Sequence, residues 1–251
     1  MTKTIGFTQQ LLQDAGIVPG MKVLDLGCGS GDVTFIVSEL TGSSGAVVGI
    51  DADQHAIAAA QAQAKSRQCS NVSFIQGNIA ELTAQPCEFD AVVGRRVLMY
   101  LPGPAEAIRR ISQAVRPGGV FVFQESDSTL VPGRTLAMPL HDRVVGWIWT
   151  TVAREGADTH MGFHLPQAMT DAGVVVDHIR AEPIIQGQGT HHPLHRIVRA
   201  MLPRITKHGV ASEAEIDIET LEQRLAAERP VGAVYVSDMA FGAWGHKPAD
   251  L

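Results

Sequence analysis

Several features are scarce or missing in this chain of 251 residues, and each absence excludes a class of protein. The three cysteines form no C-x-x-C pair, which excludes a disulfide framework and a zinc ribbon and fits a reducing compartment. No apolar run approaches the ~20 residues that a membrane-spanning helix needs. Residues 1–20 lack a basic start followed by an apolar stretch, so we expect no signal peptide and a cytoplasmic protein.

Positive charge is also in deficit, with 20 Lys and Arg against 26 Asp and Glu, which gives a formal net charge of −6. The basic residues are scattered, so they form no surface of the kind that neutralises phosphates, and a nucleic-acid partner is disfavoured. We therefore expect a small molecule as the partner. The length suits one α/β domain with insertions, and a hydrophobic content of 45% can build its core.

The stretch from Val23 to Asp32 joins an apolar run, a glycine turn and an amphipathic segment, which predicts a strand, a ligand loop and a helix. Gly27, Gly29 and Gly31 leave room for a ligand beside the backbone N–H groups that open the helix. The third glycine comes one residue earlier than in the dinucleotide fingerprint. This spacing argues against a plain NAD site.

Apolar runs alternate with amphipathic segments along the chain, which predicts a doubly wound parallel sheet with its ligand beyond the carboxyl ends of the strands. The predicted strands cover residues 23–26, 46–50, 72–75, 88–93, 120–123, 174–185 and 233–244. The predicted helices cover residues 4–15, 32–40, 53–65, 104–115, 136–154, 165–172, 194–205 and 212–229. Pro203 is expected to kink or divide its helix.

The predicted organisation is a single domain over residues 1–251, with a cofactor-binding core at residues 20–125. Residues 126–172 and 190–230 have no linker-like composition, so we interpret them as helical lid insertions that bind the substrate. The apolar helices of these insertions could equally form a homodimer interface.

Five motifs follow one another in the first half of the chain: residues 23–31, 48–51, 77–79, 89–93, and Leu101-Pro102 followed by residues 116–119. Together they resemble the class I S-adenosylmethionine-dependent methyltransferases, in the branch similar to ubiquinone/menaquinone-type and small-molecule natural-product enzymes. The resemblance implies a Rossmann-like, seven-stranded, mostly parallel sheet with an antiparallel last strand. It also implies S-adenosyl-L-methionine as cofactor and S-adenosyl-L-homocysteine as its product.

The resemblance also implies which residues bind the cofactor. They are Asp25, Gly27, Cys28, Gly29, Asp51, Ala52, Asn78, Ile79 and Arg95. Asp25 could bond to the ammonium group, directly or through water, and Asp51 could accept hydrogen bonds from both ribose hydroxyls. Asn78 and Ile79 would contact adenine, although the family often has Asp where Asn78 stands.

No motif specifies the methyl acceptor or a general base. The weak candidates for catalysis are His164, His191, His192, His195 and Arg96, because histidine titrates in the useful range and Arg96 could reach an anionic substrate. Each has a plainer interpretation, as a surface histidine or as a guanidinium paired with a nearby carboxylate. The three closely spaced histidines lack a carboxylate or cysteine at matching spacing, so we predict no metal site there.

The expected function is metal-independent methyl transfer to an O, N or C atom of a small organic molecule in secondary metabolism. Arsenite methylation would need several thiols around the acceptor, whereas all three cysteines fall in the cofactor half. Catechol-type transfer would need an Asp/Asn cluster where Gly94-Arg95-Arg96 stands. Two alternatives stay open: a sulfonium-assisted cyclisation or rearrangement, and a non-catalytic binding module.

Overall fold

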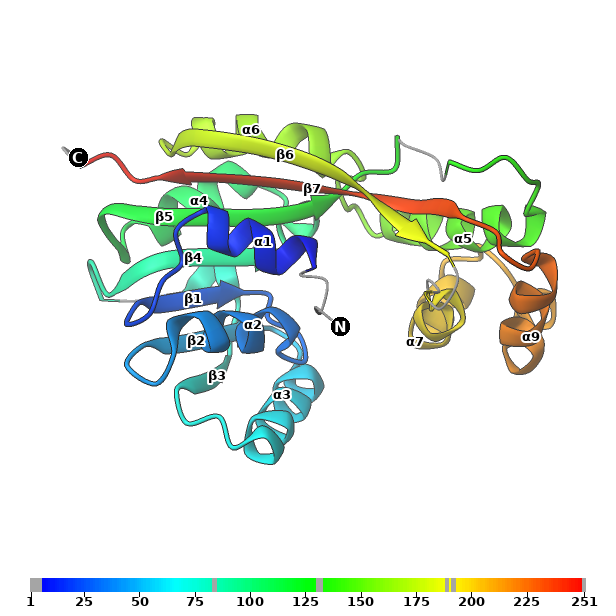
Figure 1. Cartoon of the computed structure of the whole chain (residues 1–251), viewed down its shortest axis with the longest axis horizontal. Helices are drawn as coiled ribbons and strands as arrows, with labels where there is room; N and C mark the ends of the chain where they lie inside the picture. The colour runs from blue at the N-terminus through cyan, green and yellow to red at the C-terminus, as the bar shows by residue number, and fades with distance from the viewer. Residues whose placement is uncertain (1–5, 83–84, 130–132, 188–189, 191–192, 250–251) are drawn as a thin grey trace. The chain divides into compact units, whose positions relative to one another are not determined.

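The central element of the fold is a seven-stranded sheet with strand order β3-β2-β1-β4-β5-β7-β6 (Figure 1). The computed structural model describes residues 6–82, 85–129, 133–187, 190 and 193–249. The strands are β1 (Lys22–Leu26), β2 (Ala46–Asp51), β3 (Val72–Gln76), β4 (Phe89–Arg95), β5 (Val115–Ser126), β6 (Val175–Gln186) and β7 (Tyr235–His246).

Helices occupy most of the segments between these strands. They are α1 (Phe7–Asp14), α2 (Asp32–Thr41), α3 (Gln54–Arg67), α4 (Pro104–Ser112), α5 (Pro139–Arg154), α6 (Met161–Asp171), α7 (Leu194–Lys207), α8 (Glu213–Ile216) and α9 (Ile218–Glu228), with short 3-10 turns η1 (Ile79–Glu81) and η2 (Leu98–Tyr100).

The directions of the strands confirm the predicted fold class. β1 pairs in parallel with β2 and β4, β2 with β3, and β4 with β5. The last strand is antiparallel to β5, because the start of β5 pairs with the end of β7: Gly118 N donates to Lys247 O at 3.0 Å, and Lys247 N donates to Gly119 O at 2.9 Å. The sheet is therefore doubly wound and mostly parallel.

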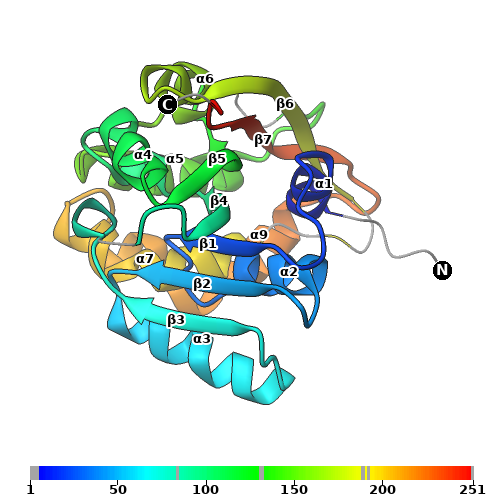
Figure 2. The same cartoon turned by 90° about the vertical axis from the view of Figure 1, so that its left-hand side faces the viewer.

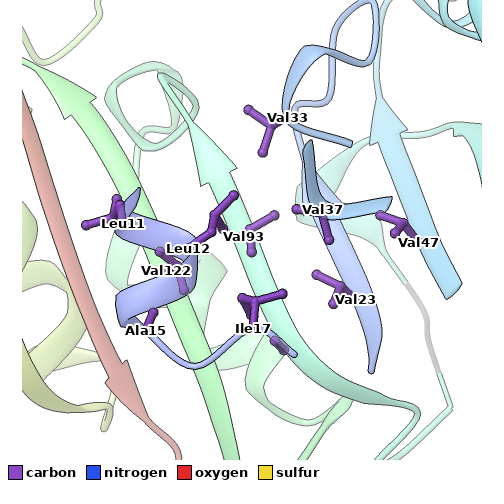
Figure 3. Packing of buried hydrophobic residues seen from close by; sticks show 11 residues of the cluster. Leu11, Leu12, Ala15, Ile17, Val23, Val33, Val37, Val47, Val93 and Val122 are labelled. Carbon is purple, nitrogen blue, oxygen red and sulfur yellow. The ribbon is translucent and has the colours of Figure 1, made fainter. Parts of the chain in front are cut away.

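The core of the sheet lies under α1 and α2, which cover one of its faces, whereas α4 lies on the other face (Figure 2). The apolar residues of β1 are buried, as expected for a strand inside a parallel sheet. Leu11 and Leu12 of α1 pack over Val93 of β4 and Val122 of β5 (Figure 3). Because β1 pairs in parallel with β2 and β4, the carboxyl ends of these three strands lie at one edge of the sheet.

Two predicted boundaries were wrong. Residues 116–119 were expected to close a helix, but they lie inside β5, since Gly118 and Gly119 pair with the last strand through Lys247. One helix was expected over residues 212–229, but Asp217 has a φ of 42° and separates α8 from α9. Aspartate tolerates this left-handed conformation better than most side chains do.

Other local predictions are confirmed. The Asp53 side chain caps α3 by accepting from His55 N at 2.8 Å. The Ser212 side chain caps α8 by accepting from Glu215 N at 3.2 Å. Pro203 does not divide its helix, because α7 continues through it, so that part of the prediction is wrong and a kink stays a prediction.

The chain divides into two compact units. The first contains Met1–Glu125, Met161–Glu182 and Ala240–Leu251, and the second contains Ser126–His160 and Pro183–Met239. α6 was assigned to a lid insertion, but it belongs to the first unit and packs on α4. In the second unit α5, α7 and α9 pack on one another. The single domain with lid insertions stays a prediction.

In the described ranges, no helix combines the length and the apolar character needed to cross a membrane.

Candidate functional site

The loop after β1 needs glycine for two physical reasons. Gly27, Gly29 and Gly31 have φ values of 61°, 53° and 95°, a left-handed conformation that other residues rarely adopt. A Cβ on Gly27 would also lie 2.6 Å from Val97 Cγ2, and one on Gly31 would lie 2.8 Å from Phe35 Cε2. Glycine at these positions therefore lets the chain make the tight turn between β1 and α2 that the sequence predicts.

Asp51, the last residue of β2, is held against this loop by hydrogen bonds. Its Oδ2 accepts from Gly29 N at 2.8 Å, and its Oδ1 accepts from Asp53 N at 2.9 Å. A carboxylate can accept about four hydrogen bonds, so both oxygens keep acceptor capacity for a ligand. The ends of β1 and β2 thus come together as the motif order predicts.

Asp25 of β1 is a buried carboxyl group, 1% exposed, beneath the glycine loop. Its Oδ2 accepts from Thr34 Oγ1 at 2.6 Å, whereas Oδ1 is buried without a hydrogen-bond partner among the described residues. Burial raises the pKa of Asp25 to about 7, although the hydrogen bond from Thr34 and the charge of Arg95 act in the opposite direction. A buried acceptor without a donor fits a site that receives a cationic N–H group from a ligand.

Arg95, the last residue of β4, connects three elements beside the loop. Its Nη2 lies 3.3 Å from Asp32 Oδ2 on α2, and its Nη1 donates to Thr8 Oγ1 of α1 at 3.5 Å. Thr8 in turn donates to Gln124 Oε1 of β5 at 2.7 Å. Burial, together with repulsion from Arg96, lowers the pKa of Arg95. Thr8 and Asp32 were not among the predicted site residues, because no motif gives their side chains a role.

The turn after β4 is held by a second buried carboxyl group, Glu125 of β5. Its Oε1 accepts from Val97 N at 3.0 Å and from Leu98 N at 2.8 Å, and its Oε2 is buried with no partner in the described part of the chain. Burial raises the pKa of Glu125 to about 7. Glu125 was not among the predicted site residues, although an acid that ends an apolar strand run is a usable signal.

Arg96 follows β4 with a φ of 53°, an uncommon conformation for a residue with a side chain. Its backbone N donates to Gln124 O at 2.8 Å, and its side chain is exposed. Tyr100 at the end of η2 is exposed as well. The turn thus presents a cation and a phenol beside the glycine loop.

These elements surround a cavity of about 300 Å³ in the first unit. The cavity is lined by Gly27, Cys28, Gly29, Ser30, Asp32, Val33, Arg95, Arg96 and Tyr100. Burial raises the pKa of Cys28 to about 12, so its thiol stays protonated. Ser30, Val33 and Tyr100 were not predicted.

Four other residues were predicted to bind the cofactor, and none of them is part of the cavity lining. Asp51 contacts the lining, because it accepts a hydrogen bond from Gly29 N. Ala52 follows β2, and Asn78 and Ile79 follow β3. Asn78 is exposed and donates to Glu81 Oε1 at 3.2 Å, and Ile79 is buried.

The predicted catalytic candidates lie on different elements, and of those in the first unit only Arg96 lines the cavity. Arg96 lines the cavity, His164 is exposed on α6 of the first unit, and His195 lies on α7 of the second unit. His191 and His192 lie outside the described residues. Within the described ranges, no group of three His, Cys, Asp or Glu side chains could hold a metal ion.

Residues 17–157, more than half of the chain, match the family model described as a methyltransferase domain. The chain belongs to this family. The match confirms the resemblance to the class I S-adenosylmethionine-dependent methyltransferases, and with it S-adenosylmethionine as the cofactor. The roles of individual residues remain proposals.

Two relatives show how far the similarity of this methyltransferase extends. A demethylmenaquinone methyltransferase of Lactococcus lactis subsp. lactis (strain IL1403) is 34% identical over 117 residues, which cover 47% of this chain and 46% of the relative. The chloroplastic 2-phytyl-1,4-beta-naphthoquinone methyltransferase of Arabidopsis thaliana is 37% identical over 122 residues, which cover 46% of this chain and 47% of the relative. The matched region thus spans about half the length of these curated relatives.

At the level of the fold the similarity covers nearly the whole chain. The crystal structure of a SAM-dependent methyltransferase from Aquifex aeolicus superimposes with a TM-score of 0.58 at 14% sequence identity. The superposition covers 96% of this chain and 89% of that one.

Proposed function

We propose that this methyltransferase transfers the methyl group of S-adenosylmethionine to an O, N or C atom of a small organic molecule, in secondary metabolism and without a metal ion. Two carboxyl groups beside the glycine loop support the proposal. Asp51 is bonded to Gly29 N at 2.8 Å, and Asp25 beneath the loop has a buried oxygen without a donor among the described residues.

The residues present fit this cofactor. Asp51 would accept from the ribose hydroxyls, and Asp25 Oδ1 would accept from the ammonium group. The backbone of Gly27, Cys28, Gly29, Ala52 and Arg95 would contact the nucleoside and methionyl parts, and Asn78 and Ile79 would contact adenine. The bound cofactor supplies a methyl group that its sulfonium has already activated.

The protein's own task is then to hold the acceptor in line and to exclude water. Arg96 and Tyr100 are exposed on the turn after β4, where Arg96 would bind an anionic part of the acceptor. The names of the two matched relatives refer to quinones. A hydroxylated aromatic ring is therefore the first class of acceptor to test.

The sequence around the cavity supports a reaction without a metal or a thiol-bound acceptor. Two cations, Arg95 at the end of β4 and Arg96 directly after it, stand where catechol-type transfer would use carboxylates. Cys28 lines the cavity, but burial raises the pKa of its thiol to about 12, so it would not supply a thiolate for arsenite.

The cofactor site is tested by titrating S-adenosylhomocysteine calorimetrically. The Asp51→Ala variant should bind at least roughly tenfold more weakly, because it loses a charge-assisted acceptor for the ribose. Asp53→Ala is the matched control: it removes the cap of α3 next to the site, which costs about 1 kcal/mol of stability, but should leave the affinity unchanged. Wild-type affinity in Asp51→Ala would contradict the assignment.

The class of reaction is tested with cofactor that carries a labelled methyl group and a cell extract. Label in a product supports transfer, unlabelled conversion supports a rearrangement, and cofactor binding without conversion supports a binding module. The proposed homodimer is tested by the molecular mass in solution. A cytoplasmic location stays a prediction.

A further inference from the structure

The second unit contains a cavity of its own, about 560 Å³ in volume. α5, α7 and α9 contribute its lining, which includes His141, His195, Arg196, Glu222, Leu225 and Arg229. All of these residues belong to the second unit, so the cavity is defined without reference to the cofactor unit. Its volume suits a small organic ligand.

His141 and Glu228 form a buried pair beside this cavity. His141 is 5% exposed, and its Nδ1 lies 2.7 Å from Glu228 Oε2. Glu228, the last residue of α9, also accepts from the backbone N of Leu140 at 2.6 Å and of His141 at 2.9 Å in the first turn of α5. The pair is therefore fixed by two helix ends.

The pair determines which nitrogen of His141 can accept a proton. Burial opposes ionisation of Glu228, but its hydrogen bonds from the His141 side chain and from two backbone groups outweigh that effect and lower its pKa. The ionised carboxylate accepts the hydrogen of Nδ1, so the neutral imidazole keeps Nε2 as a proton acceptor.

One polar group beside the His141–Glu228 pair lacks a partner in the described part of the chain. The Tyr235 hydroxyl is buried and has no hydrogen-bond partner among the residues that the structure describes. The Tyr235 ring packs edge-on against the imidazole, with ring centroids 6.0 Å apart and an angle of 77°. A buried hydroxyl without a partner is costly. Tyr235 is not part of the cavity lining, so its contribution to the site is to pack against the His141 imidazole.

The cavity is lined by two arginines without an ion-pair partner among the described residues and by one carboxylate that faces a histidine. Arg196 and Arg229 have no ion-pair partner within the described ranges, whereas the carboxylate of Glu222 lies 3.4 Å from His195 Nε2. Leu225 adds an apolar wall. The lining therefore combines a proton acceptor, two cations without an ion-pair partner in the part of the chain described, the Glu222–His195 pair and an apolar surface.

We propose that this cavity binds a small aromatic molecule with a weakly acidic hydroxyl, such as a phenol, as its anion. The hydroxyl proton passes to Nε2 of His141, which becomes an imidazolium stabilised by Glu228, and the phenolate oxygen is neutralised by Arg196 and Arg229. No bond to carbon changes, and the proton returns when the ligand leaves. The site does not depend on the proposed methyl transfer.

The test uses the full-length chain and 4-nitrophenol, which is yellow only as its phenolate. At a pH somewhat below the pKa of the free phenol, added protein should increase the phenolate absorbance until it saturates. His141→Gln should abolish this increase, and Arg196→Gln should weaken binding roughly fivefold.

Three variants control this experiment. Arg199→Gln removes an exposed arginine of α7 that is paired with Glu219, so it should leave the signal unchanged. Asp51→Ala should also leave it unchanged, which separates this site from the cofactor site. Because His141→Gln could fail to fold, its circular dichroism is recorded, and the exposed Arg196→Gln tests the site without that risk. No absorbance increase with the wild-type chain, or a wild-type increase in folded His141→Gln or in Arg196→Gln, would overturn the proposal.

Discussion

Asp25 and Glu125 are buried carboxyl groups at the carboxyl ends of two strands of the sheet, and each has one oxygen without a partner among the described residues. They hold different parts of the site. Asp25 lies beneath the glycine loop, whereas Glu125 holds the backbone of Val97 and Leu98 in the turn that presents Arg96. Burial raises the pKa of both groups to about 7, so their charge state changes near neutral pH.

Binding of S-adenosylhomocysteine should release a proton from Asp25. Near neutral pH the carboxyl group is partly protonated in the free protein, and an ammonium group beside it favours the ionised form. The calorimetric heat should therefore depend on the ionisation enthalpy of the buffer, and affinity should increase from about pH 6 to about pH 8.

Asp25→Asn should remove both the buffer dependence of the heat and the pH dependence of the affinity, because the amide does not titrate. Asp51→Ala should bind weakly but still release the proton. Equal heats in buffers of different ionisation enthalpy would show that Asp25 does not meet the ammonium group.

At the scale of single elements, close packing between α1 and β7 leaves no room for a side chain at Gly242. A Cβ there would lie 2.6 Å from Leu11 Cδ1, and Leu11 is buried in the core. Gly242→Ala should lower the free energy of unfolding by ~1–3 kcal/mol, because the buried leucine must shift.

Gly146 in α5 is the matched control, since it is exposed and a Cβ there would meet nothing within 4 Å. Gly146→Ala should raise the free energy of unfolding by about 0.5–1 kcal/mol through helix propensity. Denaturant unfolding measures both variants. Equal changes in the two would contradict the packing argument.

At the scale of the whole molecule, the two buried carboxyl groups make stability depend on pH. Their pKa values are about 7 in the folded protein, above the ordinary values of 3.8 and 4.5 for Asp and Glu. The folded state therefore binds more protons than the unfolded state between these limits, so this contribution is fully present below the ordinary values and is lost as the pH rises to about 7. Glu88, Asp90 and Glu155 have lowered pKa values and act in the opposite direction, in acid.

The melting temperature should therefore fall between about pH 5 and about pH 7.5. Glu125→Gln should flatten this decline, because a neutral amide can still accept from Val97 N and Leu98 N without a buried charge. Parallel pH profiles for the wild type and this variant would contradict the assignment.

The amino-acid sequence by itself determined the order of strands and helices, the glycine loop, the position of Asp51 and the family. These features depend on hydrophobic periodicity, turn chemistry and short motifs, which are properties of neighbouring residues. Even the Asp53 cap follows from local sequence.

The tertiary structure alone decided which distant side chains meet. Arg95 lies 87 positions from Thr8, and His141 lies 87 positions from Glu228, yet both pairs are in contact. Packing also placed α6 in the first unit and brought Glu125 to the turn after β4. Such contacts arise when whole elements pack to bury their apolar faces, and no local pattern specifies which polar side chains that packing brings together.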